Sequence, residues 1–260
     1  MTRFICMWSG PRNLSTAMMR SFGARPDCDV WDEPFFAPFL HITGKAHPGR
    51  AETLERHETD PQKIARACLA PGPNKAPFFF QKHMPHHMIS GFPRDWMRDE
   101  RISHFFLIRD PARVIASYAK GRAEFTYDDL GFGPQNKLFH DFSQHLGHPP
   151  PVINSHDILT HPKAALATLC TALHMPFDLS MLSWEKGPHL EDGAWAPYWY
   201  GSVWNSTGFH PPSKDISPSK NTSTDAPKLH TQENYHDLLA RCEEDYAPLK
   251  AAQITIAPNN

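Results

Sequence analysis

Residues 4–19 read FICMWSGPRNLSTAMM, and they are the most informative stretch of the chain. An apolar run breaks at Ser9-Gly10-Pro11, and an amphipathic segment begins at Ser15-Thr16. This pattern predicts a strand, a tight loop and the N-terminus of a helix. Backbone N–H groups in such a loop converge on one point, where the helix dipole favours an anion. We therefore expect a phosphate or sulfate group to bind there.

The loop residues are the first candidate binding site. Arg12 adds a charged donor, and Ser15 and Thr16 add hydroxyl groups. A Walker A loop would place Gly-Lys-Ser/Thr where this chain has Ser15-Thr16-Ala17, so the loop resembles a P-loop that does not serve ATP or GTP hydrolysis. A capped helix without a ligand is the alternative. The candidate binding residues are Gly10, Pro11, Arg12, Asn13, Leu14, Ser15 and Thr16.

Strands and helices alternate along the rest of the chain. Strands are expected near 28–31, 77–81, 104–108 and 151–154, with helices near 14–22, 61–69, 112–120, 135–146, 162–174 and 229–246. Alternation of this kind predicts an α/β fold: a three-layer, P-loop NTPase-like arrangement with a central parallel sheet of about five strands and helices on both faces. We expect one domain over residues 1–260, with an irregular lid or insertion at 35–60 and a Trp-rich region at 184–221.

The composition of the chain limits the binding partners and the cellular compartment that we expect for it. A formal net charge of −2 gives no reason to expect nucleic acid or an acidic membrane surface as a partner. The five cysteines are far apart and odd in number, which favours a reducing compartment. The first strand follows directly on residues 1–3, and no apolar run reaches the roughly 18 residues of a membrane span. The chain is therefore expected to be cytoplasmic; its oligomeric state is not indicated.

A second group of candidate binding residues follows the strand expected at 104–108. Arg109 leaves the end of that strand, Asp110-Pro111 begins a helix, and Ser117 lies eight residues after Arg109. Arg109 and Ser117 could reach one anion if a neighbouring loop lies alongside. The alternative is structural: Asp110 caps the helix, Arg109 is a surface residue and Ser117 is a small buried one.

Together the two groups of residues resemble motifs of the sulfotransferase family, whose donor is 3′-phosphoadenosine 5′-phosphosulfate (PAPS). The resemblance implies that Arg12, Ser15 and Thr16 hold the 5′-phosphosulfate and that Arg109 and Ser117 hold the 3′-phosphate. Residues 155–176 are similar to a third segment of that family, although Ser155 and His156 replace its acidic pair. The implied activity is sulfuryl transfer from PAPS to a hydroxyl of a small-molecule acceptor, in a site that the Trp-rich region would help to form.

The same resemblance offers two candidates for the base. Glu33 follows the second strand, where some bacterial sulfotransferases have a catalytic glutamate. His83 lies in Lys82-His83-Met84-Pro85, which is similar to the Thr-His-Leu-Pro of cytosolic sulfotransferases, and we favour it slightly. Gln81 stands where those enzymes have a lysine, so Arg12 or Lys82 would stabilise the bridging oxygen instead.

Other features leave alternatives open. His83, His86 and His87 could bind zinc, but Pro85 interrupts them and no third-ligand motif follows, so no metal is expected. Residues 206–209 and 219–221 stand where the family closes a loop over the donor, without its usual Arg-Lys-Gly. The alternative functions are a P-loop nucleotide-dependent kinase or phosphohydrolase, which would need Mg²⁺, and a non-catalytic anion-binding protein with a sulfotransferase-like fold.

Overall fold

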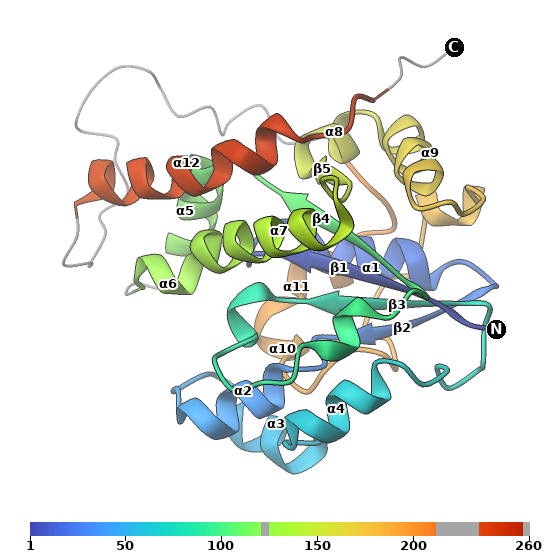
Figure 1. Ribbon diagram of the computed structural model, residues 1–260, viewed down its shortest axis with the longest axis horizontal. Helices are drawn as coiled ribbons and strands as arrows, with labels where there is room; N and C mark the ends of the chain where they lie inside the picture. Colours follow the sequence, from blue (N-terminus) through green and yellow to red (C-terminus); the bar gives the residue numbers. More distant parts are fainter. Residues whose placement is uncertain (121–124, 212–233, 257–260) are drawn as a thin grey trace.

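A parallel sheet organises the computed structural model, which describes residues 1–120, 125–211 and 234–256 (Figure 1). Five strands pair in the order β2-β3-β1-β4-β5, and every pairing is parallel. The strands are β1 (Arg3–Ser9), β2 (Cys28–Asp32), β3 (Phe78–His83), β4 (Ile102–Ile108) and β5 (Val152–Asn154). Parallel strands need helical crossovers, which cover both faces of the sheet. The predicted three-layer α/β fold is confirmed.

The helices lie in two layers. One layer includes α1 (Ser15–Gly23), α8 (Ser155–Thr160), α9 (Pro162–Ala172) and the 3₁₀ turn η3 (Leu179–Leu182). The other includes α4 (Pro61–Ala67), η2 (Asp95–Arg98), α7 (Phe132–Leu146) and α12 (Tyr235–Ala251), and Figure 1 shows α7 and α12 side by side. The remaining elements are α2 (Phe36–Thr43), α3 (Arg50–Arg56), η1 (Pro85–His87), α5 (Pro111–Ala119), α6 (Tyr127–Leu130), α10 (Ala196–Trp199) and α11 (Gly201–Trp204).

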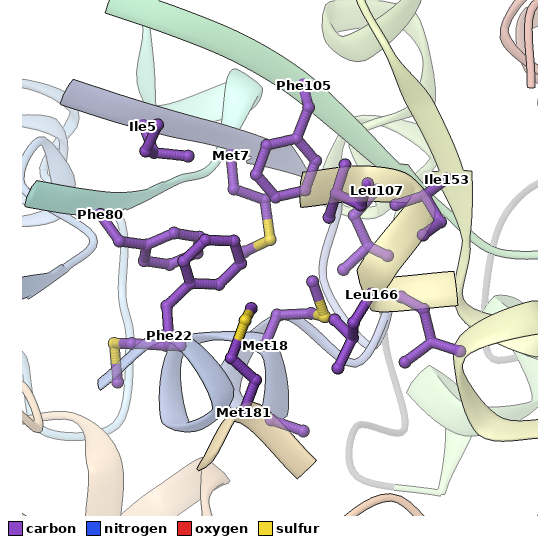
Figure 2. Close-up of a cluster of buried hydrophobic side chains, with 14 of the residues drawn as sticks. Ile5, Met7, Met18, Phe22, Phe80, Phe105, Leu107, Ile153, Leu166 and Met181 are labelled. Carbon is purple, nitrogen blue, oxygen red and sulfur yellow. The ribbon is translucent and has the colours of Figure 1, made fainter. Parts of the chain in front are cut away.

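Side chains alternate between two apolar cores along each strand. On one face Met7 and Phe80 pack against Met18 and Phe22 of α1, as Figure 2 shows. On the other face Trp8 belongs to a separate cluster with the α7 and η2 residues. Because successive strand residues point to opposite faces, a one-residue difference decides which layer a side chain meets.

The segment 35–60 corrects the sequence analysis, which expected irregular structure there. Residues 36–43 and 50–56 are helical, as α2 and α3. Helix α2 buries Phe36, Phe39 and Leu40 at helical spacing. Pro38 obscured this pattern, but it lies in the first turn, where a missing N–H breaks no helical hydrogen bond. The helix ends at Gly44, whose φ of 64° gives the left-handed C-terminal cap.

Buried amides hold the carboxyl ends of β1 and β4 together. The side-chain amide of Gln135 donates to the carbonyls of Trp8 (3.1 Å) and Leu107 (3.0 Å), and that of Asn13 donates to Leu107 (3.3 Å). The chain leaves β1 toward β2 and leaves β4 toward β5, so the sheet's connections reverse direction between β1 and β4. In open α/β sheets, ligands bind at this switch point.

The structure also bears on the expectations for membrane spans, disulfides and the C-terminal helix. None of the helices within the described ranges combines the length and apolar character that crossing a bilayer requires. No disulfide joins the five cysteines, all of which are described and buried. The helix expected at 229–246 is described from residue 235 onward, as α12, and residues 229–233 lie outside the described ranges.

Candidate active site

The loop after β1 has the geometry of an anion cradle. Arg12 and Leu14 take left-handed backbone conformations, with φ of 62° and 76°. Helix α1 begins directly after them, and no side chain caps its first turn. Alternating backbone handedness at a helix N-terminus points successive N–H groups to one side, and those groups then need an external acceptor. The loop therefore has the backbone geometry that suits an anion.

Two guanidinium groups join this cradle to the end of β4. Arg109 donates from Nη1 to the carbonyl oxygen of Arg12 (2.6 Å), and Arg12 donates from Nε to Ser117 Oγ (3.1 Å). Burial lowers the pKa of both guanidiniums from the usual 12.5, although arginine still stays cationic at neutral pH. Neither group is among the ion pairs of the described residues. Two partly buried cations without carboxylate partners make the switch point attractive to a polyanion.

Asp110 and Pro111 occupy structural positions next to Arg109. Asp110 accepts a hydrogen bond from the backbone N–H of Arg113 (3.1 Å), and Pro111 takes the first position of α5. The carboxylate thus serves as the N-cap that the sequence suggested. A Walker B acid would instead present its carboxylate toward a nucleotide-bound Mg²⁺, so this arrangement does not favour the kinase alternative.

Acidic and basic groups form a buried cluster at the ends of β2 and β3. The Lys82 ammonium lies 2.7 Å from Asp32 Oδ1, 2.8 Å from Glu33 Oε1 and 3.4 Å from Thr16 Oγ1. Tyr200 donates its hydroxyl to Asp32 Oδ2 (2.6 Å) and accepts from Lys82 (2.5 Å). The side chains of Lys82, Asp32 and Glu33 are 0%, 1% and 9% exposed. Lys82 therefore links the anion loop to Glu33.

The cluster shifts the proton affinity of its members. Burial raises the pKa of Glu33, and Asp32 raises it further, while Lys82 acts in the opposite direction. Burial disfavours the Lys82 ammonium, but the two carboxylates outweigh it and raise the pKa of Lys82 well above 10.5. A carboxylate with a raised pKa, held in a cavity, has the properties of a general base.

A cavity of about 360 Å³ brings most of the predicted residues together. Residues 11–17 line it, with Arg109, Ser117 and Glu33. Gly10 does not line it: this residue lies behind the loop, where an added Cβ would come within 3.0 Å of the Leu130 carbonyl oxygen. The remaining lining residues include an apolar wall formed by Phe36, Phe39, Met84, Trp195, Trp199, Tyr200 and Val203.

His83 lies outside this cavity. Its ring stacks on Trp8 (centroids 4.6 Å apart) and contacts Gln81 Oε1 through Nε2 (3.2 Å). Because it follows Lys82 in β3, it points to the opposite face of the sheet. Burial lowers its pKa to about 3. This placement argues against His83 as the base, which the sequence analysis had slightly favoured.

The neighbouring histidines do face the cavity. His86 and His87 follow β3 on the turn η1, and both line the cavity. Among the described residues, no group of three His, Cys, Asp or Glu side chains is arranged to hold a metal ion. Sequence patterns pointed to the Trp-rich region and the histidine cluster. They did not predict Tyr200, His87 or the pair of Lys45 and Asp129 as cavity residues.

Of the two C-terminal segments considered for closing over the donor, the structure describes only residues 206–209. Residues 206–209 lie away from the cavity lining: Phe209 packs on Trp184 (centroids 5.0 Å apart), and Ser206 accepts from Trp184 Nε1 (3.3 Å). Residues 219–221 lie outside the described ranges.

Comparisons with known proteins identify the family of the chain. A family model described as a sulfotransferase domain matches residues 3–229. Two Arabidopsis thaliana proteins are similar in sequence: branched-chain-amino-acid aminotransferase-like protein 2 is 40% identical over 235 residues (90% of this chain, 39% of that protein). Branched-chain-amino-acid aminotransferase-like protein 1 is 39% identical over 207 residues (80% and 36%). The chain thus spans less than two fifths of these relatives.

Two solved structures share the fold. A sulfotransferase domain from the curacin biosynthetic pathway has a TM-score of 0.56 and 14% identity, covering 95% of this chain and 98% of that one. A sulfotransferase domain from the Synechococcus PCC 7002 olefin synthase has a TM-score of 0.51 and 12% identity, with 94% of each chain covered.

Proposed function

This chain belongs to the sulfotransferase domain family, and from that premise we propose that it transfers the sulfuryl group of PAPS to a hydroxyl group of a small-molecule acceptor. One observation carries the choice of donor. The anion loop and the two guanidiniums of Arg12 and Arg109 share one cavity, and hydrogen bonds join them into a single unit. Two cationic positions around one cavity suit a nucleotide with anionic groups at two positions.

The residues present fit such a donor. The left-handed loop and the uncapped first turn of α1 offer backbone N–H groups, to which Ser15 and Thr16 add hydroxyls for the 5′-phosphosulfate. Arg109 and Ser117 would hold the 3′-phosphate. Each charge-assisted hydrogen bond contributes about 1.5–3 kcal/mol. Bound PAPS supplies an activated sulfuryl group with the nucleotide as leaving group.

Glu33 is the base in this proposal. Its carboxylate takes the acceptor proton as the acceptor oxygen bonds to sulfur and the bond from sulfur to the 5′-phosphate oxygen breaks. The products are a sulfate ester and adenosine 3′,5′-bisphosphate. The Lys82 ammonium, between Thr16 and Glu33, offsets the negative charge that develops near the loop.

The test measures adenosine 3′,5′-bisphosphate formed from PAPS by liquid chromatography and mass spectrometry, with a mixture of small alcohols as acceptors. We expect release that depends on the alcohols and needs no Mg²⁺. Glu33→Gln should lower this rate about 10²–10⁴-fold, the usual contribution of a general base. The exposed residue Glu52, changed to Gln, is the matched control.

The outcomes separate the alternatives. A requirement for Mg²⁺ and cleavage of ATP would support the kinase alternative. Tight binding of adenosine 3′,5′-bisphosphate without release from PAPS, and no effect of Glu33→Gln, would support a non-catalytic anion-binding protein.

A further inference from the structure

The polar groups beside Glu33 leave one carboxylate oxygen and one imidazole nitrogen facing each other. Glu33 Oε1 is paired with Lys82, whereas Glu33 Oε2 lies 3.9 Å from His87 Nδ1. His87 Nδ1 is buried and has no hydrogen-bond partner among the residues that the structure describes. An orphaned buried polar atom costs free energy unless a ligand or water satisfies it. Both residues line the cavity, so a bound molecule can supply the missing partner.

The His87 ring is held in a fixed orientation. It stacks on Phe36 (4.7 Å between centroids, 21° between planes) and on Phe39 (4.9 Å, 25°), both from helix α2. Burial lowers its pKa well below 6.5, and His86 lowers it further, so the ring is neutral at pH 7. A neutral imidazole offers one donor and one acceptor. With its proton on Nδ1, the ring donates toward the carboxylate, which can only accept.

The distance between these two atoms suits a shared oxygen atom. Hydrogen bonds to oxygen or nitrogen are roughly 2.7–3.2 Å long, so one oxygen can reach both atoms of a pair 3.9 Å apart. A hydroxyl group there would accept from His87 Nδ1–H and donate to Glu33 Oε2. This arrangement directs the hydroxyl proton toward the proposed base.

The charges on this side of the cavity are already paired. Lys82 pairs with Asp32 and Glu33, and Lys45 pairs with Asp129. The two guanidiniums without carboxylate partners belong to the nucleotide end. The rest of this side is mainly aromatic and aliphatic side chains. Moving a charged group into such surroundings without a counter-charge is costly.

We propose that the acceptor is an uncharged alcohol with an apolar body, and that its hydroxyl binds between Glu33 Oε2 and His87 Nδ1. This inference rests on the proposed function of the same cavity. His87 is then a catalytic-site residue that contacts the acceptor, and it orients the hydroxyl rather than taking its proton.

The first experiment compares three alcohols that share a benzyl alcohol core: uncharged benzyl alcohol itself, anionic 4-(hydroxymethyl)benzoate and cationic 4-(aminomethyl)benzyl alcohol. Turnover with PAPS and binding to the complex with adenosine 3′,5′-bisphosphate are measured for each. We expect kcat/KM and affinity to be at least tenfold higher for benzyl alcohol. Preference for either charged alcohol, or failure to bind or turn over benzyl alcohol while the nucleotide binds, would overturn the proposal.

The second experiment replaces His87. His87→Leu should raise the KM for benzyl alcohol about tenfold and leave the KM for PAPS unchanged, since a hydrogen bond to the acceptor alone is lost. His87→Asn, whose amide N–H can replace Nδ1–H, should restore part of the loss. The exposed His41 on α2, changed to Leu, is the matched control.

Three results would distinguish the possible failures. Equal rises in both KM values, or equal loss in the Leu and Asn variants, would mean that His87 is only structural. An unchanged acceptor KM in His87→Leu would also refute this inference while leaving sulfuryl transfer intact. No binding of adenosine 3′,5′-bisphosphate and no PAPS turnover with any alcohol would refute the proposed function itself.

Discussion

Replacing Lys82 with Met should destabilise the protein strongly, because the ammonium is the counter-charge of two buried carboxylates. In the native cluster, Asp32 and Glu33 share one cation that is fully buried. Methionine has a similar length and no charge, so both carboxylates would be left in an apolar site. Breaking a buried pair by removing one partner costs about 3–5 kcal/mol.

This cost translates into a measurable melting temperature. A chain of this size shifts by about 2–4 °C per kcal/mol, so Lys82→Met should melt roughly 6–20 °C lower at pH 7. The same change at Lys63 is the matched control: that side chain is 59% exposed and pairs with Glu58 on the surface. An exposed pair is worth no more than about 1 kcal/mol, so Lys63→Met should shift the melting temperature by less than about 4 °C.

The pH dependence of the stability difference between Lys82→Met and the natural protein identifies the cause of that difference. In the native cluster Lys82 opposes the rise that burial causes in the pKa of Glu33. Without Lys82 this pKa lies further above its unfolded value, so the folded state binds more protons and gains stability as the pH falls. The difference between Lys82→Met and the natural protein should therefore shrink from pH 8 to pH 5 in differential scanning calorimetry. A shift no larger than that of Lys63→Met, or a gap that is constant with pH, would refute the role given to the cluster.

Changes at Arg109, at Glu33 and in the protonation of two buried histidines should also have measurable effects. Arg109→Ala should weaken binding of adenosine 3′,5′-bisphosphate by at least tenfold and ADP by less than threefold in calorimetric titrations; equal losses would remove Arg109 from the 3′-phosphate site. Because burial raises the pKa of Glu33 above 4.5, kcat/KM should fall as the pH drops through that raised value. If the Glu33→Gln variant showed the same fall of kcat/KM at low pH, Glu33 would not be its source. Burial lowers the pKa of His83 to about 3 and that of His104 to about 4, so the unfolded state binds more protons than the folded state below pH 6.5. In urea unfolding, the free energy of unfolding should therefore fall between about pH 6.5 and pH 4, by up to about 1.4 kcal/mol per pH unit for each group. A free energy of unfolding that did not change over this range would contradict the burial of both rings in neutral form.

Local patterns predicted the anion loop and the Arg109 end of the site. An apolar strand, a Gly-Pro turn and the hydroxyl residues that start the next helix are contiguous, so their physics can be read directly from the sequence. The parallel sheet then brings Arg12 and Arg109 to the same edge, because both follow the carboxyl ends of strands that are neighbours.

The face of β3 could not be decided in the same way. Lys82 and His83 are adjacent, and the resemblance of the motif favoured His83 as the cavity residue. The structure pairs Trp8 with His83 in the register of β1 and β3, and it buries Trp8 in the core opposite α1. The sequence did carry a signal that Lys82, rather than His83, points to the α1 face of the sheet. In a strand, Phe80 and Lys82 lie on the same face, and Phe80 packs in the core with α1.

The remaining contacts of the site depend on tertiary structure. Tyr200 lies 168 residues from Asp32 in the sequence, and its hydrogen bond follows only from packing of the Trp-rich region on β2. The stacking of His87 on α2 was hidden for a related reason, since the helix itself was not predicted. Side chains that meet through such non-local packing leave no periodic pattern in the sequence.

A calorimetric titration with adenosine 3′,5′-bisphosphate, ADP and Mg-ATP tests whether this cavity binds PAPS. If the two proposed anion sites are joined through Arg12, the 3′-phosphorylated nucleotide should bind at least tenfold more tightly than ADP, without Mg²⁺. Tighter binding of Mg-ATP, or no binding of adenosine 3′,5′-bisphosphate, would contradict the assignment of this cavity to PAPS.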